Sequence, residues 1–227
     1  MSKTVLITGA SRGIGAQTAR QFANAGYRVA INYYTNRQAA IYLLEELKKA
    51  GADADIFCAD VSDRIQVDSM VSQATERFGQ IDVLVNNAGI AQQKLFTDLT
   101  SEEWHRMFAI NMDGMFHTVQ SSIWGIAGAS CEVHYSASKA AVIGFTKALA
   151  KELGPSHITV NCVAPGVIDT EMNVQLDQET KDCLCEETPL GIIGKPKDIA
   201  GTILFLASDQ GNFLTGQVIS PNGGIVI

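Results

Sequence analysis

A tyrosine and a lysine four residues apart are the side chains of this sequence best suited to acid–base chemistry. Tyr135 and Lys139 lie in a strongly helical stretch, so their spacing places the phenol and the ammonium on one helix face. A nearby ammonium favours the phenolate and lowers the pKa of a tyrosine from about 10. Such a tyrosine can donate a proton to a carbonyl oxygen and take it back in the reverse reaction. Taken alone, this spacing is more typical of an ordinary surface pair.

The glycine-rich segment TGASRGIG, residues 8–15, is suited to binding phosphate. It follows an apolar run, residues 4–7, that predicts a buried strand, and it leads into an amphipathic helical pattern. Glycines on such a turn allow positive φ values and a close approach to phosphate, and the helix N-terminus offers unpaired N–H groups. The spacing differs from the common G-x-G-x-x-G, so it also fits a turn without a ligand. We interpret it as a dinucleotide pyrophosphate site.

The elements that position these residues alternate regularly between strand and helix. Strands are expected at residues 4–7, 27–33, 54–59, 81–85, 157–163 and 217–220. Helices are expected from Ile14 and at residues 37–50, 62–78, from Thr100, 135–153 and 198–208. This order predicts a doubly wound parallel α/β sheet with helices on both faces, in a single domain spanning residues 1–227. The polar segment 167–194 has no clear period and is expected to act as a substrate lid.

One interval is too short for this architecture. Asn111 and Ser122 are 11 positions apart, whereas a crossover and its strand need about 15 or more residues. Residues 121–125 resemble the end of a strand whose body is absent, so we expect about 15–20 residues to be missing between Gln120 and Ser121. Either they are truly deleted, or the molecule contains a segment that the printed sequence omits. The second alternative is favoured, because a chain without a central strand should not fold into an ordered domain.

Composition excludes several classes of function. The net charge of −7 and the scattered basic residues argue against nucleic acid or an anionic membrane as a partner. No apolar run is long enough to span a bilayer, and the first residues do not form a signal peptide. Five cysteines without a regular spacing suggest free thiols in a reducing cytoplasm. Cys183 and Cys185 lack a second pair or a histidine cluster, so no metal site is expected.

Considered together, the motifs identify a family. In chain order they are TGASRGIG, Asp60-Val61, Asn87-Ala88-Gly89, Asn111, Ser122, Tyr135 with Lys139, and Pro165-Gly166. This set resembles the short-chain dehydrogenase/reductase family over the whole chain. The resemblance implies a Rossmann-type sheet, a nicotinamide cofactor and hydride transfer to or from a carbonyl or alcohol carbon.

The resemblance also implies roles for individual residues. Tyr135 would be the general acid/base, and Lys139 would lower its pKa and hold the nicotinamide ribose. Ser122, which lies 13 positions before Tyr135, would bond the substrate oxygen, and Asn111 would hold a water in the proton relay. The residues expected to contact the cofactor are Gly9, Ser11, Arg12, Gly13, Ile14, Gly15, Tyr34, Asp60, Val61, Asn87, Ala88, Gly89, Tyr135, Lys139, Pro165, Gly166, Ile168 and Thr170.

The end of the second predicted strand indicates which nicotinamide cofactor is used. A carboxylate there would bond the ribose 2′-hydroxyl of NAD, but the residues are Asn32, Tyr33 and Tyr34. Arg12 in the glycine turn and Arg37 beyond the strand could each pair with a 2′-phosphate. We therefore predict NADP(H). The alternative is that both arginines face solvent and NAD binds equally well.

The substrate is less constrained. The segments LVNNAGI, GFTKALAKEL, ITVNCVAPG and TGQV most resemble 3-oxoacyl-[acyl-carrier-protein] reductases of fatty acid synthesis. Residues 121–125 and 128–133 also resemble reductases of a 5-aminopentanone group on elongation factor P, and His134 could line the pocket. Another small-ketone or alcohol dehydrogenase and a catalytically silent cofactor-binding scaffold remain alternatives. The resemblance further implies a homotetramer, with interfaces formed by the helix from Tyr135 and by the last helix and strand.

Overall fold

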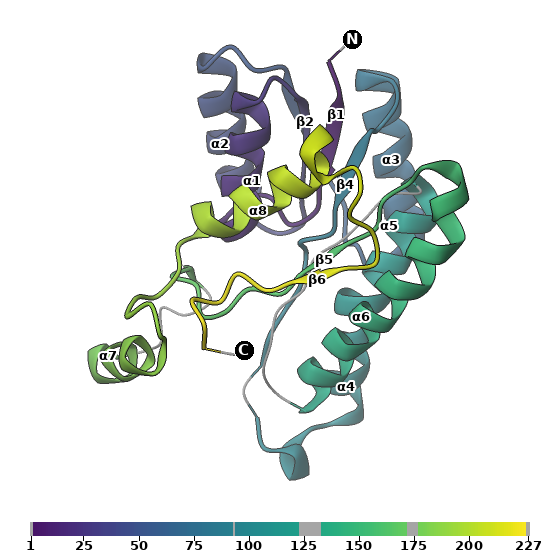
Figure 1. The fold of residues 1–227 in the computed structure, drawn as a ribbon. Helices are drawn as coiled ribbons and strands as arrows, with labels where there is room; N and C mark the ends of the chain where they lie inside the picture. The colour runs from purple at the N-terminus through teal and green to yellow at the C-terminus, as the bar shows by residue number, and fades with distance from the viewer. Residues whose placement is uncertain (1, 93, 123–132, 172–176, 226–227) are drawn as a thin grey trace.

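The sheet that carries the glycine turn has four parallel strands in the order β3-β2-β1-β4. Figure 1 labels β2, β1 and β4 of this sheet. The computed structural model describes residues 2–92, 94–122, 133–171 and 177–225, without the side chains of residues 96, 122 and 133–136. The strands are β1 (Thr4–Ile7), β2 (Arg28–Tyr33), β3 (Ala54–Cys58) and β4 (Val83–Val85). The predicted parallel α/β class is confirmed.

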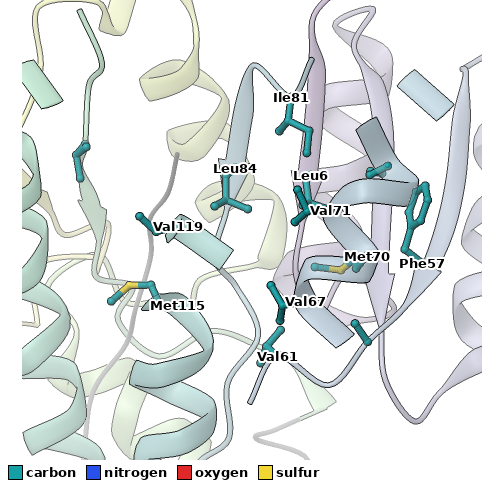
Figure 2. Close-up of a cluster of buried hydrophobic side chains, with 14 of the residues drawn as sticks. Leu6, Phe57, Val61, Val67, Met70, Val71, Ile81, Leu84, Met115 and Val119 are labelled. Carbon is teal, nitrogen blue, oxygen red and sulfur yellow. The ribbon is translucent and has the colours of Figure 1, made fainter. Parts of the chain in front are cut away.

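Helices cover both faces of this sheet because strand residues alternate between two apolar cores. Val5 and Ile7 of β1 lie in one core with residues of α1, α2 and α8, and Leu6 lies in the other with residues of α3, α5 and α6. Figure 2 shows the second core, where Leu6 lies beside Val71 of α3. The helices are α1 (Gly13–Asn24), α2 (Arg37–Lys49), α3 (Arg64–Phe78), α4 (Ser101–Phe108), α5 (Gly114–Ser122), α6 (Val133–Leu153), α7 (Gln178–Glu187) and α8 (Pro196–Ala207). None of the described helices is long and apolar enough to cross a bilayer.

Local side-chain caps explain where two of these helices begin. The Asp63 carboxylate accepts hydrogen bonds from the backbone N–H groups of Ile65 and Gln66 at the start of α3. Thr100 and Glu103 form a reciprocal capping box at the start of α4. Both starts fall close to the positions that the sequence predicted.

The second half of the fold carries a separate, smaller sheet. Among the described strands, β5 (Cys162–Val163) pairs in parallel only with β6 (Val218–Ile219). The expected strand at residues 157–163 is therefore shortened to two residues, because a strand extends only as far as it has a partner. Within the described ranges, no strand pairs with the second edge of β4 or joins β4 to β5. This arrangement agrees with the absence of a strand between them.

An unsatisfied polar group lies at the same place. Asn86 directly follows β4, and its side chain is buried. Its Oδ1 accepts a hydrogen bond from the hydroxyl of Thr118 at 2.6 Å, but its Nδ2 has no partner among the described residues. A buried donor without a partner is costly, and the loss of a neighbouring strand would leave such a donor.

The sequence predicted that Ser121 and Ser122 would lie at the end of a strand. The structure does not place them there. Both belong to the last turn of α5, which runs without interruption from Gly114. The hydroxyl of Ser121 bonds the carboxylate of Asp68 on α3, so this serine is part of the α3–α5 contact.

The segment 167–194 also has more regular structure than expected. It contains α7, which begins where the Asp177 side chain accepts the backbone N–H of Thr180. None of the residues of α7 is buried, so its sequence lacks the apolar stripe by which a helix is usually recognised. At the base of the segment, Ile168 pairs with Gly194 in an isolated parallel bridge. Its expected role as a lid stays a prediction.

The mass of the protein purified from its natural source tests whether a strand is missing from the molecule itself. We expect an intact mass above the 24.4 kDa of the printed sequence, by about 15–20 residues, because a parallel sheet interrupted at its centre is a poor folding unit. Electrospray mass spectrometry measures this directly. A mass equal to 24.4 kDa would contradict the expectation and would establish a true deletion through the sheet.

Candidate active site

A cleft of about 820 Å³ lies where the four parallel strands end. The loops that follow β1, β2, β3 and β4 all contribute to its wall. Open parallel sheets bind ligands at these carboxyl ends of their strands. The structure brings most of the predicted site residues together here. Those that line the cleft are Gly9, Ser11, Arg12, Gly13, Ile14, Tyr34, Asp60, Val61, Asn87, Ala88, Gly89, Lys139, Pro165 and Thr170.

The glycine turn is closely packed against the loop after β4. A Cβ on Gly9, whose φ is +59°, would lie 2.9 Å from the Cα of Ala88. A Cβ on Gly15 would lie 2.5 Å from the Nδ2 of Asn87. Both contacts are shorter than a side chain tolerates, so only glycine permits this approach. Because Gly15 lacks a Cβ, the turn can pack closely against Asn87. Gly15 is not among the residues that line the cleft.

Asn32, at the end of β2, fastens the turn to the sheet. Its Oδ1 accepts the backbone N–H of Gly9 at 3.1 Å, and its Nδ2 donates to the carbonyls of Phe57 and Ala59 at 3.3 and 3.1 Å. The side chain is 2% exposed. The sequence analysis considered Asn32 only as a position that lacks a carboxylate and missed this role, because only the pairing of β2 with β3 brings Phe57 and Ala59 within reach.

Thr8 and Asn87 provide a second fastening between β1 and β4. The Thr8 hydroxyl oxygen accepts the backbone N–H groups of Asn87 and Ala88, both at 3.0 Å. The Asn87 side chain donates to the carbonyls of Thr8 and Gly9 at 2.9 and 3.0 Å. The polar groups of this loop are therefore used to fix the shape of the cleft floor.

The N-terminus of α1 fits an anionic group. Arg12 occupies the N-cap position, where its side chain makes no capping hydrogen bond, and the first turn contains no acidic residue. The leading N–H groups of a helix carry partial positive charge and favour phosphate when they are not capped. With glycines at positions 9, 13 and 15, this end of the cleft is suited to the pyrophosphate of a dinucleotide.

Arg12 forms an ion pair at the margin of the cleft. Its Nη1 lies 3.1 Å from the Oε2 of Glu171, and both residues line the cleft. Glu171 was not among the residues predicted from the sequence, although it directly follows the predicted site residue Thr170. Arg37, the other predicted phosphate partner, is the first residue of α2 and is not among the residues that line the cleft.

Asp60 and Tyr34 lie where the adenine end of a nucleotide was expected. One carboxylate oxygen of Asp60 accepts the backbone N–H of Ser62 at 2.9 Å and its hydroxyl at 2.6 Å. This local turn fixes the loop after β3. The ring of Tyr34 is 56% exposed and forms an open side of the cleft.

Lys139 provides the titratable group at the other end of the cleft. Burial lowers the pKa of its ammonium to about 8, because removing a charge from water disfavours the protonated form. A Cβ on Gly89 would lie 3.8 Å from the Nζ of Lys139 and 3.2 Å from the Oδ1 of Asn111. Gly89 thus leaves room for both polar groups at one place.

Asn111 is held by the loop after β4. It lies in a π-helical turn, Ala109–Asp113, between α4 and α5, and such turns are frequent at functional sites. Its Oδ1 accepts the backbone N–H of Ile90 at 2.9 Å and its Nδ2 donates to the carbonyl of Ile90 at 3.0 Å. Asn111 and Lys139 line one small cavity next to the cleft. Its expected role in a proton relay stays a prediction.

Tyr135 and Ser122 are placed only by their backbones. Tyr135 lies in the first turn of α6, one turn before Lys139, so the predicted helical spacing holds. Ser122 is the last residue of α5. Their side chains lie outside the described part of the structure, as does that of His134. Residues 123–132, which contain most of the likeness to the elongation factor P reductases, lie outside it as well.

Two further predicted cofactor residues are placed away from the cleft wall. Ile168 is 5% exposed and belongs to the apolar core with α1 and α8. Gly166 packs against the C-terminal segment, where a Cβ would lie 2.8 Å from the Cα of Asn222. Both support the loop after β5, whose Pro165 and Thr170 do line the cleft.

Taken together, these features form a long cleft with an anion-binding turn at one end and a lysine of lowered pKa at the other. Such a site can bind an extended anionic ligand and place one end of it beside an acid–base group.

Comparison with known proteins agrees with this description. The family model described as Enoyl-(Acyl carrier protein) reductase matches residues 9–226. The chain is 40% identical to 3-oxoacyl-[acyl-carrier-protein] reductase FabG of Staphylococcus aureus over 242 residues, with 99% of this chain and 98% of the relative covered. For the FabG protein of Thermotoga maritima, the identity is 39% with the same coverage.

Solved structures give the same result. A dehydrogenase/reductase from Sinorhizobium meliloti superposes with a TM-score of 0.95 at 34% identity, covering 100% of this chain and 96% of that chain. A blue fluorescent protein from a metagenomic library, solved in complex with NADPH, superposes with a TM-score of 0.93 at 34% identity, covering 99% and 98%.

The alignment also bears on the missing strand. It spans 242 residues, whereas this chain has 227, so at least 15 residues of the Staphylococcus aureus relative have no counterpart here. This number agrees with the deficit inferred from the spacing of Asn111 and Ser122. Motif order, sheet and full-length similarity lead to one conclusion: the chain belongs to the short-chain dehydrogenase/reductase family of oxidoreductases.

Proposed function

We propose that this protein reduces a 3-oxoacyl group carried by acyl carrier protein, with NADPH as the reductant. The observation that carries the proposal is the single cleft that joins the glycine turn at α1 to Lys139 on α6. The full-length similarity to 3-oxoacyl-[acyl-carrier-protein] reductases supports this substrate class. The similarity to a protein solved with NADPH supports the cofactor.

The residues present fit a dinucleotide. The uncapped start of α1 would receive the pyrophosphate, and Asp60 and Val61 would lie beside the adenine. Arg12 would pair with a 2′-phosphate, since it is the arginine of the glycine turn and lines the cleft. Asn87, Ala88 and Gly89 would line the path toward Lys139. Bound there, the dinucleotide supplies the hydride.

The chain's own residues would manage the proton. Lys139 would hold the nicotinamide ribose and favour the phenolate form of Tyr135, one helical turn away on α6. Tyr135 would donate its proton to the carbonyl oxygen as that oxygen gains negative charge, and Ser122 would bond the same oxygen. Ser122 ends a helix in this structure. The missing strand would reposition it, because Ser122 follows the gap directly.

Exposed apolar side chains support assembly into an oligomer. Phe205 on α8 and Val218 on β6 are 42% and 36% exposed, and Phe213 between them is fully exposed. Large apolar groups exposed on one segment of a chain are candidates for protein–protein contacts. They lie on the last helix and strand, which the family resemblance designates as an interface of a homotetramer.

Replacing the proposed acid tests the mechanism. The assay follows NADPH oxidation with an acetoacetyl thioester, in the chain of 227 residues and in a form lengthened by about 15–20 residues between Gln120 and Ser121. We expect the lengthened form to turn over faster. In that form, Tyr135→Phe should lower kcat by about 10²–10⁴-fold, because the proton donor is lost. Unchanged turnover in the Tyr135→Phe protein would rule out this mechanism.

The cofactor preference is tested by comparing the two reductants. We expect KM for NADPH to be about 10–100-fold lower than KM for NADH, because charged hydrogen bonds to the 2′-phosphate add binding energy. Steady-state kinetics with each reductant measure the ratio. A lower KM for NADH would show that Arg12 does not bind a 2′-phosphate.

The lowered pKa of Lys139 makes a prediction about stability. With a folded-state pKa of about 8 and an unfolded value of 10.5, the cost of burying the ammonium is fully present below pH 8. It disappears as the pH rises toward 10.5. Without nucleotide at pH 7, Lys139→Met should therefore raise the free energy of unfolding by about 1–3 kcal/mol, while catalysis is lost.

Urea unfolding at pH 7 and pH 10.5 measures this difference. The matched control is Lys147→Met, which changes an exposed lysine of the same helix and should change stability by less than about 0.5 kcal/mol. A Lys139→Met protein that is less stable than the unchanged chain at pH 7 would contradict the argument.

A further inference from the structure

Glu171 is an acidic residue placed beside the one arginine of the glycine turn. The Nη1 of Arg12 and the Oε2 of Glu171 are 3.1 Å apart, and each side chain is 61% exposed. The two residues are 159 positions apart in the sequence, so the fold brings together the start of α1 and the segment after β5. Both line the nucleotide cleft.

The backbone segments that carry Arg12 and Glu171 also lie close together beside the ion pair. A Cβ on Gly13 would lie 3.8 Å from the Cγ2 of Thr170, so the residue before Glu171 lies close to the residue after Arg12. The segment is also fixed at its base, where the backbone N–H of Asp169 donates to the carbonyl of Gly194 at 2.8 Å. The position of Glu171 relative to the turn is therefore set by its backbone and does not depend on the ion pair alone.

This geometry creates competition for one cation. A phosphate ester that pairs with Arg12 must either displace the Glu171 carboxylate or bind close to it. Displacement breaks an existing pair, and close binding places like charges together. An uncharged 2′-hydroxyl neither displaces the Glu171 carboxylate nor places a second negative charge beside it. The carboxylate of Glu171 therefore opposes 2′-phosphorylated nucleotides and leaves unphosphorylated ones unaffected.

We propose that Glu171 is a specificity-determining residue that reduces the preference for 2′-phosphorylated nucleotides by pairing with Arg12. The inference rests on the proposed nucleotide site and goes beyond it. In this inference, an acidic residue outside the glycine turn controls how strongly Arg12 selects NADPH over NADH. Because the pair is solvent-exposed, its effect is moderate and depends on salt.

Two small nucleotides isolate the effect from catalysis. Adenosine 2′,5′-bisphosphate and adenosine 5′-monophosphate differ only in the 2′-phosphate. Isothermal titration calorimetry measures the Kd of each nucleotide for the protein of 227 residues. We expect Glu171→Gln to lower the Kd of the bisphosphate by about three- to tenfold at low salt. The Kd of the monophosphate should change less than twofold.

A double-mutant cycle tests whether Glu171 acts through Arg12. In an Arg12→Gln background, Glu171→Gln should change bisphosphate binding by less than twofold. The matched control is Glu179→Gln, an exposed glutamate on α7, which should leave both Kd values unchanged. Thermal unfolding of each variant verifies that it is folded.

The outcomes separate this inference from the proposed function. If the unchanged chain prefers the bisphosphate and Glu171→Gln does not strengthen that preference, the inference fails and the nucleotide site stands. An equal effect of Glu171→Gln with and without Arg12 also overturns it. If the unchanged chain binds neither probe, both the site and the inference fail.

Discussion

The buried amide of Asn32 is the contact on which the nucleotide end of the cleft depends. One side chain accepts the N–H of Gly9 and donates to the carbonyls that end β3. It thereby fixes three successive loop origins relative to one another. Thr8 and Asn87 extend the same arrangement to β4. Buried networks of this kind define one geometry, because every alternative leaves a polar group without a partner.

Much of the part of the fold that contains β1 to β4 could be predicted from the sequence. Near-continuous apolar runs marked β1, β2 and β3, and the capping residues Asp63 and Thr100 marked helix starts within about two residues. These signals are local, so a single sequence contains them. The glycine turn was predicted from its place between a strand and a helix, and the structure adds that Gly9 also admits the close approach of Ala88.

Other features depend on contacts that no local pattern records. The role of Asn32 requires knowing that β2 pairs with β3, and the role of Glu171 requires knowing that the segment after β5 returns to the glycine turn. The exposed helix α7 lacks an apolar stripe and was missed. Ser121 and Ser122 were misassigned to a strand because spacing was used without regard to how far α5 could continue.

The two halves of the site therefore have different structural support. The half that contains the glycine turn, where the nucleotide is proposed to bind, stands on a four-stranded sheet with its hydrogen bonds in place. The half that carries Lys139 is attached through the core shared by α3, α5 and α6 and through the two-stranded sheet. Under the proposed function, a defect in the second half would therefore impair catalysis and leave nucleotide binding intact.

The second edge of β4 has a consequence for the life of the protein in a cell. In the part of the chain described, its backbone groups have no neighbouring strand, and such an edge is a template for other extended chains. A newly made molecule would be exposed to capture by its neighbours until this edge is covered. Its yield of active protein would then fall as the rate of synthesis rises, and chaperones that bind extended segments would limit that loss.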